Sequence, residues 1–369
     1  MSAYLGRRMF MFGSATFLTQ LMLFRRAEAK LLQPGSAVPT VDSLDIKVLM
    51  DGSHDIFMKP VGPKSVRIKR ARFDDYRRTL HSMWGLSLAL ESVAGAETRR
   101  VILDFGYQPD ALLANMELLK VDPAKFDSII LSHGHFDHFG GLVGFLQKHR
   151  GVMKRDLTLY AGGEDVFCER KARTAVPDHF SDFGYVDREA ISAQQVNIVK
   201  CERPTVISDH AFTTGTIQRT SFEKVLPNSM VVSGRIGAMN GCDPALVPGR
   251  EAGKIVPDQH IHEHATCYNL RGKGLVVITS CGHAGIINTI RQAIEVSGVK
   301  KLHALVGGTH LAPADSDYVS RAVAELKTFD PDVVIPMHCS GLNFIEAVRQ
   351  QMPDRLALST NGSEFTFGA

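Results

Sequence analysis

The sequence predicts a layered α/β protein, an αββα sandwich of two mixed sheets flanked by helices. The composition, 44% hydrophobic and 22% charged over 369 residues, is that of an ordinary folded protein with a substantial core. Short apolar segments follow one another between residues 41 and 105 before any strong helical pattern. In the last part of the chain, apolar segments alternate with helical ones, and three of them run into a histidine within a few residues.

The individual elements follow from periodicity and from the residues that interrupt it. Strands are predicted over 44–50, 86–91, 100–105, 126–131 and 157–161. Helices are predicted over 109–121, which Asp122-Pro123 ends, and over 142–149. In the second half, strands at 275–279, 302–306 and 333–336 precede helices at 286–296, 316–329 and 343–352. Residues 164–220 lack a clear repeat and are interpreted as an insertion that covers the site and shapes the substrate pocket, within a single domain spanning 30–369.

The most informative segment runs from residue 131 to 143 and holds three histidines and one aspartate within six residues. It lies between a predicted strand and a predicted helix, so these side chains sit on a tight turn whose glycines supply backbone freedom. Alternate spacing lets His133 and His135 converge on one ion, while Asp137 and His138 can face a second. Neutral imidazole and carboxylate are ligands that zinc, iron and manganese accept. The run therefore predicts a metal site.

This His-x-His-x-Asp-His pattern, its hydrophobic lead-in and its trailing Gly-Gly-Leu resemble the metallo-β-lactamase superfamily. Further motifs, Cys-Gly-His-Ala-Gly-Ile at 281–286, Gly-Gly-Thr-His-Leu at 307–311 and His-Cys-Ser-Gly at 338–341, are similar to one branch of it. That branch includes the archaeal dihydropterin ribofuranosyl-aminobenzene phosphate synthase. The resemblance covers roughly residues 41–344 and implies the αββα fold, a dinuclear site and hydrolase-like chemistry.

The resemblance also implies roles for residues outside the first run. His338 matches the superfamily's last ligand, and His283 is expected as a further ligand. Asp104 matches an early aspartate that orients a ligand histidine. His310 is expected in the site as a ligand, a hydrogen-bond donor to substrate or a general acid. The aspartate that commonly bridges the two ions is missing, since the segment reads Ser-Cys-Gly-His at 280–283, and His283 is expected to replace it without bridging.

Two groups of residues keep two interpretations each. His260, His262 and His264 alternate as they would on one face of a strand, and a solvated strand face explains them at least as well as a metal site. His264 is the strongest metal candidate of the three. Cys281 and Cys339 fit equally well as small core residues or as weak ligands.

These features predict a metal-dependent hydrolase. Two divalent ions, zinc or else manganese or iron, would share a water, lower its pKa and hold the resulting hydroxide against a small ester, lactone, amide or phosphate substrate. Asp137 would ligate an ion and orient the nucleophile, and His310 would protonate or polarise the leaving group. An iron-dependent redox enzyme of the same fold and a non-catalytic binding protein are the competing hypotheses.

Residues 1–29 differ from the rest of the chain. Arg7-Arg8, a largely apolar stretch and Arg25-Arg26-Ala-Glu-Ala29 resemble a twin-arginine export signal and predict a periplasmic or exported protein. An uncleaved membrane anchor and a cytoplasmic extension are the alternatives.

Charge and cysteine content bear on the partners. The leader holds four of the 42 Lys and Arg and one of the 39 Asp and Glu, which leaves 38 of each and argues against a nucleic-acid partner. The expected partner is a small-molecule substrate, with no membrane contact beyond the leader. The six cysteines contain no Cys-x-x-Cys pair, so neither a disulfide scaffold nor a zinc ribbon is expected.

Overall fold

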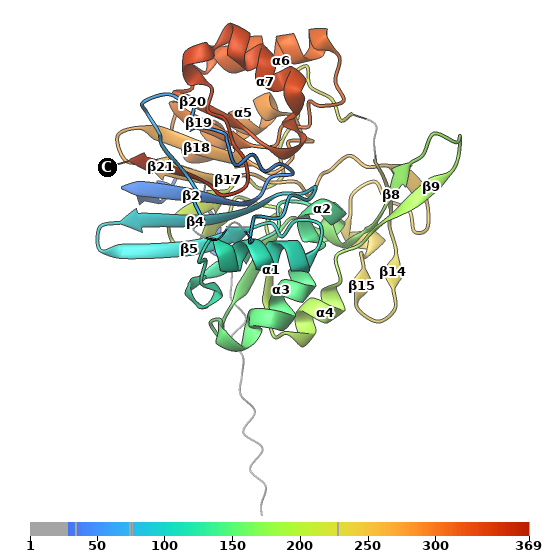
Figure 1. The fold of residues 1–369 in the computed structure, drawn as a ribbon. Helices are drawn as coiled ribbons and strands as arrows, with labels where there is room; N and C mark the ends of the chain where they lie inside the picture. Colours follow the sequence, from blue (N-terminus) through green and yellow to red (C-terminus); the bar gives the residue numbers. More distant parts are fainter. Residues whose placement is uncertain (1–28, 34, 74, 76, 227–228, 369) are drawn as a thin grey trace, which may run out of the picture.

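The computed structural model describes residues 29–33, 35–73, 75, 77–226 and 229–368. The predicted leader lies outside the described residues except for its last position. Two large sheets pack face to face, with helices on both outer faces (Figure 1). The predicted αββα sandwich is therefore confirmed. Within the described part of the chain, no helix has the length and apolar character needed to cross a membrane.

The first sheet has eight strands in the order β10-β7-β6-β5-β4-β2-β21-β3. They are β2 (Ser43–Met50), β3 (Arg67–Arg70), β4 (Ser87–Ala94), β5 (Glu97–Leu103), β6 (Ser128–Ile130), β7 (Thr158–Ala161), β10 (Asn197–Lys200) and β21 (Ser363–Gly368). Strands β5, β6, β7 and β10 are parallel to one another. Helices α1 (Pro109–Leu118) and α3 (Leu142–His149) cover the outer face, and the short α2 (Phe136–Phe139) carries the end of the histidine run.

The second sheet has the order β11-β12-β17-β18-β19-β20, with β1 paired to β17. Its strands are β1 (Thr40–Val41), β11 (Val206–Ile207), β12 (Ala211–Thr213), β17 (Thr266–Leu270), β18 (Gly274–Thr279), β19 (Leu302–Gly307) and β20 (Val333–Pro336). Helices α5 (Ile286–Ser297), α6 (Ser316–Thr328) and α7 (Gly341–Gln351) cover its outer face. Because β18, β19 and β20 are parallel, the three loops that carry histidines leave the sheet at the same edge.

Apolar side chains of the two sheets meet in a central layer that supports this edge. Ile46 and Leu88 from the first sheet and Val276 and Val306 from the second are fully buried there. Burial of each such side chain contributes roughly 1.5–3 kcal/mol relative to exposure. The loops at the edge are therefore attached to a close-packed base.

The segment predicted as an insertion, 164–220, is divided between the sandwich and a smaller sheet. β10, β11 and β12 belong to the two large sheets. The smaller sheet, called here the accessory sheet, consists of β8 (Glu169–Arg173), β9 (Phe180–Gly184), β13 (Ser229–Val232) and β16 (Ile255–Pro257). It thus also uses residues beyond 220. A disulfide joins Cys168, directly before β8, to Cys242, in the segment between β13 and β16. No cysteine motif had indicated this disulfide.

The remaining elements are short. Near the accessory sheet in sequence lie α4 (Arg188–Ala193), β14 (Arg235–Ile236) and β15 (Asn240–Gly241). Single 3-10 turns occupy Pro123–Lys125, Arg150–Val152, Glu164–Phe167, Pro244–Leu246, His338–Ser340 and Pro353–Arg355.

Candidate metal centre

Asp104 fixes the shape of the loop that carries the histidine run. Its carboxylate accepts hydrogen bonds from Ser132 N at 2.8 Å and Ser132 Oγ at 2.7 Å. His138 Nδ1 lies 2.7 Å from Asp104 Oδ2, and both side chains are fully buried. Since a carboxylate in this position accepts, Nδ1 of His138 carries the hydrogen and Nε2 is left to face the site. The expected role of Asp104, orienting a ligand histidine, agrees with this geometry.

His262 supports the same loop from the other side. Gly134, between the first two histidines of the run, donates its N–H to His262 Nε2 at 3.0 Å. Nε2 is therefore an acceptor, so Nδ1 carries the hydrogen and donates to Asp165 Oδ2 at 2.7 Å. Gly134 must be glycine here, because a Cβ would lie 2.6 Å from the carbonyl oxygen of Val166.

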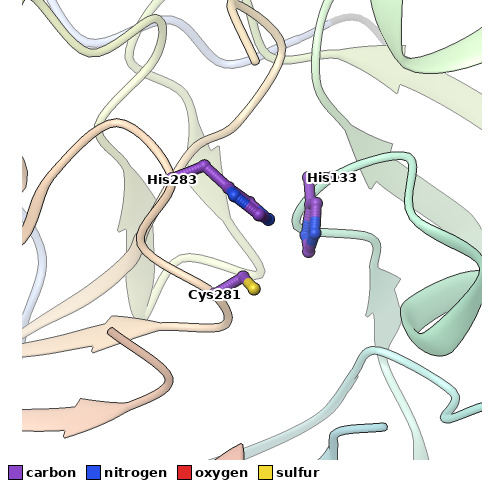
Figure 2. Close-up of side chains that lie close together, drawn as sticks. All are labelled: His133, Cys281 and His283. Carbon is purple, nitrogen blue, oxygen red and sulfur yellow. The ribbon is translucent and has the colours of Figure 1, made fainter. Parts of the chain in front are cut away.

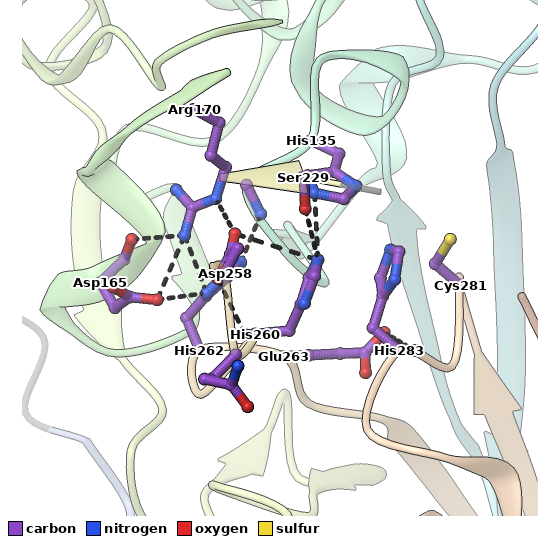
Figure 3. A network of polar contacts seen from close by, with 12 residues as sticks. His135, Asp165, Arg170, Ser229, Asp258, His260, His262, Glu263, Cys281 and His283 are labelled. Carbon is purple, nitrogen blue, oxygen red and sulfur yellow. Dashed lines mark hydrogen bonds and ion pairs between the residues drawn. The ribbon is translucent and has the colours of Figure 1, made fainter. Parts of the chain in front are cut away.

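Arg170 contacts the carboxylates of Asp165 and Asp258 (Figure 3), and its side chain is completely buried. Its guanidinium donates to Asp258 Oδ2 at 2.9 Å, to Asp165 Oδ2 at 3.2 Å and to three backbone carbonyls. Asp165, Asp258 and His262 offer donor atoms close enough to hold an ion. Arg170 already supplies the positive charge that the two carboxylates need, so this network is structural.

The loop from 258 to 264 differs from its prediction. His260, His262 and His264 do not form a solvated strand face, since each is at most 2% exposed in a loop between β16 and β17. The accessory sheet and its Arg170 network supply the partners that allow such polar side chains to be buried. His264, the favoured metal candidate of the three, instead contacts Leu131 O through Nε2 at 3.1 Å.

His260 is the member of this loop that faces the predicted ligands. Its Nε2 lies 3.1 Å from His135 Nε2. Its ring stacks on that of His283, with 3.9 Å between centroids and 12° between planes. Phe183, on β9 of the accessory sheet, closes the other side of His135 at 5.0 Å between ring centroids.

The loop after β20 brings His338 to the far end of the run. His338 Nε2 lies 3.2 Å from His138 Nε2 and 3.2 Å from Asp137 Oδ2. Its backbone N–H donates to the buried Asp51 Oδ1 at 2.5 Å. Trp84, which is 52% exposed, lies with its ring 4.7 Å from the His338 ring and forms a wall at the surface.

The loops after β18 and β19 complete the cluster. The ring centroids of His283 and His133 lie 5.0 Å apart, with 60° between the ring planes, and the Cys281 thiol points toward the same space (Figure 2). The buried Glu263 carboxylate holds the His283 loop by accepting from His283 N at 3.0 Å and from the next backbone N–H at 2.6 Å. His310 is half-buried, with its ring 4.1 Å from that of His283.

Four residues of the cluster adopt a left-handed backbone conformation, although none is glycine. The φ angles are 59° at Asp104, 49° at His260, 49° at His310 and 50° at His338. Each costs of order 1–3 kcal/mol, and such strain concentrates at functional sites. The surrounding fold therefore maintains these side chains in place against a local preference.

Burial keeps most of the imidazoles neutral. It lowers the pKa of His133, His135 and His283 well below the usual value, and that of His260 to about 3. The positive charge of one ring also disfavours protonation of its neighbours. Neutral imidazole is the form that binds metal ions.

Asp137 and His338 are the exception. Burial raises the pKa of the Asp137 carboxyl, but the charge of His138 and the hydrogen bond with His338 outweigh it and hold that pKa below its usual range. Burial lowers the pKa of His338, but the charges of Cys339, Asp137 and Asp51 together with the Asp137 hydrogen bond raise it to about 9. The two side chains therefore form an ion pair in the protein alone.

The cluster fits divalent metal ions. Among the described residues, donor atoms within 4.8 Å of one another form four overlapping groups, namely His133, Cys281 and His283; His135, His260 and His283; His138, Cys281 and His338; and Cys281, His310 and Cys339. The buried nitrogens His133 Nε2, His283 Nδ1 and His283 Nε2 have no hydrogen-bond partner among the residues that the structure describes. An unpartnered buried polar atom costs about 1–3 kcal/mol, which coordination of a cation offsets. Imidazole, thiol and carboxylate together suit zinc or iron.

All the residues predicted for the site except His264 come together here; His260 and His262, which had been left open between a metal site and a solvated strand face, lie in or beside it, and Arg170 was missed. The signal that could have found the first two is the density of titratable groups between 258 and 264, where five of seven residues are Asp, Glu or His. Arg170 carries no such signal, because its partners are distant in sequence.

Comparisons with known proteins agree with the fold and the site. Residues 92–161, which include the histidine run, match the family described as the Metallo-beta-lactamase superfamily. A crystal structure described as a metal-dependent hydrolase of the beta-lactamase superfamily has a TM-score of 0.62, covers 87% of this chain and 98% of that chain, and is 19% identical. The resemblance to the metallo-β-lactamase superfamily that the motifs had predicted is therefore confirmed over residues 92–161, and the described residues share the fold of that structure.

Within that class the sequence is similar to an archaeal enzyme. The relative is the 7,8-dihydropterin-6-methyl-4-(beta-D-ribofuranosyl)-aminobenzene-5'-phosphate synthase of Methanocaldococcus jannaschii, 27% identical over 272 residues, or 72% of this chain and 84% of that protein. An uncharacterised protein of the same organism is 25% identical over 258 residues, or 68% of this chain and 83% of that protein. Superfamily and relative both indicate an enzyme.

Proposed function

We propose that the protein is a metal-dependent hydrolase that uses two divalent ions, zinc or else manganese or iron, on a small ester, lactone, amide or phosphate substrate. The observation that carries the proposal is the buried cluster of neutral imidazoles that converges from both sheets, with the Asp137 carboxylate beside it. Divalent ions in such a cage polarise the substrate and lower the pKa of water toward neutrality.

The donors fall into two sets that share one atom. The first set is His133, His135, His260 and His283, and the second is Asp137, His138 and His338. Cys281 Sγ is close to members of both sets. Cys281 would therefore help to hold both ions, whereas His283, which the sequence had suggested in place of the bridging aspartate without bridging, would hold one.

The remaining residues would act on water and substrate. Asp137, as a carboxylate at the edge of the cluster, can accept a hydrogen bond from the attacking water and set its direction. His310 borders a small cavity whose lining includes Lys224, Thr309 and Tyr318. A leaving group on this side of the cluster would be within reach of the His310 imidazole, which can polarise or protonate it.

Two matched variants test the ligand sets. His260→Ala should weaken zinc binding by more than the roughly 10–100-fold that an outer contact typically contributes. His264→Ala, four residues away in the same loop, should leave two ions bound, because its Nε2 contacts a backbone carbonyl. Equilibrium dialysis with zinc measures both affinities. Equal affinities in the two variants would remove His260 from the ligand set.

A second pair separates binding from turnover. Asp137→Ala should retain one ion and lose most activity, whereas His310→Ala should retain both ions and turn over more slowly. Activity is measured on phosphodiester, lactone, ester and amide substrates with zinc- and manganese-loaded protein. Iron after native expression, with oxygen consumption and no hydrolysis, would instead support the redox alternative.

A synthase-type reaction is the second candidate. The archaeal relative is named as a synthase, and the match with this chain covers 84% of that protein. The same ligand cage could bind the phosphate of a ribofuranosyl phosphate substrate. Incubation with a ribofuranosyl-aminobenzene 5'-phosphate and a 7,8-dihydropterin that carries a leaving group on its 6-methyl carbon, followed by mass spectrometry of the products, tests this. A condensed product, without hydrolysis of the substrates above, would favour the synthase.

We also propose that the protein is exported by the twin-arginine pattern at Arg7 and Arg8. The Cys168–Cys242 disulfide supports this, because disulfides persist mainly in oxidising compartments. Changing both arginines to lysine should leave the precursor in the cytoplasm, as fractionation would show. Unchanged delivery would contradict the assignment.

A further inference from the structure

Two cysteines lie against each other on the floor of the cluster. Cys281 follows β18 and Cys339 follows β20, yet their Sγ atoms are only 3.1 Å apart. Both thiols are free and each residue is 3% exposed. The other two free cysteines, Cys201 and Cys267, are also buried and are not paired with a second cysteine among the described residues.

Gly308 allows this approach. Strand β19 lies between β18 and β20 in the sheet, so the two side chains can meet only above the end of β19. A Cβ at Gly308 would lie 2.8 Å from Cys339 Sγ and 3.1 Å from Cys281 Cα. Any larger residue there would separate the thiols.

His310 holds the pair from the side. Its backbone N–H donates to Cys339 Sγ at 3.2 Å, and its Nδ1 lies 3.5 Å from Cys281 Sγ. The two sulfurs are about 1 Å farther apart than in a disulfide, where the bond is about 2.05 Å long. Small side-chain rotations would close that gap.

We propose that Cys281 and Cys339 form a reversible disulfide, with hydrogen peroxide as the oxidant. One thiolate attacks a peroxide oxygen and breaks the O–O bond, giving a sulfenic acid and a hydroxide that takes up a proton. The second sulfur then attacks the sulfenic sulfur, forms the S–S bond and releases water. Two thiols and one peroxide thus give one disulfide and two waters.

The consequence for the metal site rests on the proposed function. Cys281 is the atom shared by the two ligand sets, so its oxidation would remove a donor from both. An ion bound to Cys281 would in turn protect the thiol from peroxide. The pair would therefore make metal binding sensitive to oxidation, and oxidation sensitive to metal loading.

The test counts thiols and needs no substrate. Full-length protein with its bound metal, and the same protein after chelation, are treated with hydrogen peroxide, denatured, alkylated and mapped by mass spectrometry. In chelated protein, the alkylated free cysteines should fall from four to two, with Cys281 and Cys339 in one linked peptide. Dithiothreitol should return Cys281 and Cys339 to the alkylated, unlinked form. Cys339→Ser should abolish the link, and the matched variant Cys267→Ser should retain it.

Four outcomes separate the alternatives. Four alkylated thiols after peroxide, or sulfinic acid at either position without a link, would overturn the proposal. Peroxide could also release a third equivalent of zinc from wild type, in addition to the two proposed ions, and no third equivalent from Cys339→Ser. That result would overturn the proposal and make Cys281, His310 and Cys339 a third metal site. Equal rates of linking in zinc-loaded and chelated protein would remove Cys281 from the proposed ligand set and leave the disulfide standing. Slower linking in the zinc-loaded protein supports both.

Discussion

His264 allows the cost of a buried neutral histidine beside the metal cluster to be measured. Its side chain is 2% exposed and contacts Leu131 O at 3.1 Å. Burial lowers the pKa of His264 from 6.5 to about 4, although the charge of Asp104 opposes the change. The unfolded chain therefore takes up a proton at this side chain near pH 6.5, whereas the folded protein does so only near pH 4.

The sign and size of the effect follow from this difference. The unfolded state binds more protons between the two pH values, so stability is fully present above pH 6.5 and falls as the pH decreases toward 4. A difference of one pKa unit corresponds to about 1.36 kcal/mol. The free energy of unfolding should therefore fall by about 3 kcal/mol, through His264 alone, as the pH decreases across this range. That is a large part of the roughly 5–15 kcal/mol by which native proteins are stable.

The variant His264→Gln removes the titration while its amide can still donate to Leu131 O. Between neutral pH and pH about 4, it should lose about 3 kcal/mol less free energy of unfolding than wild type. Urea unfolding in the presence of a chelator, followed by circular dichroism, measures this. His81→Gln replaces an exposed histidine and serves as the control. An equal loss in wild type and His264→Gln would refute the reasoning.

Three further predictions concern the support of the cluster. Arg170→Met should lower the free energy of unfolding by about 3–5 kcal/mol in the same urea assay, because two buried carboxylates lose their cation. The control Arg173→Met changes an exposed residue and should leave the free energy of unfolding nearly unchanged. Gly134→Ala should weaken zinc binding, because the added Cβ would lie 2.6 Å from a carbonyl oxygen. The control Gly151→Ala has open space around its Cβ and should bind zinc as wild type does. Unchanged zinc affinity in both variants would contradict the close approach at Gly134. Asp104→Asn should reduce zinc affinity about 10–100-fold in a competition titration, and a normal value would show that it does not orient His138.

The strand, turn and helix around His133 could be predicted because their pattern is local: an apolar strand, glycines, clustered histidines and an apolar helix lie within a few turns of chain. The loop that holds His260 could not. Alternating histidines look the same on a solvated strand and in a buried polar loop, and what decides between them is Arg170, 92 residues away from His262. The accessory sheet is likewise built from antiparallel pairs between distant segments, such as β8 with β13, which leave no local pattern.

The donors of the cluster come from both halves of the sandwich, with His133 and His138 following the first sheet and His283 and His338 the second. An ion bound by residues of both halves would crosslink the loops of the two sheets at this edge. At a free concentration one hundred times its dissociation constant, it would add about 2.7 kcal/mol to folding stability. Loss of the ion would leave the central apolar layer intact but release the edge loops, which are the segments a protease would cleave first. Metal scarcity would then shorten the lifetime of the protein as well as stop its chemistry.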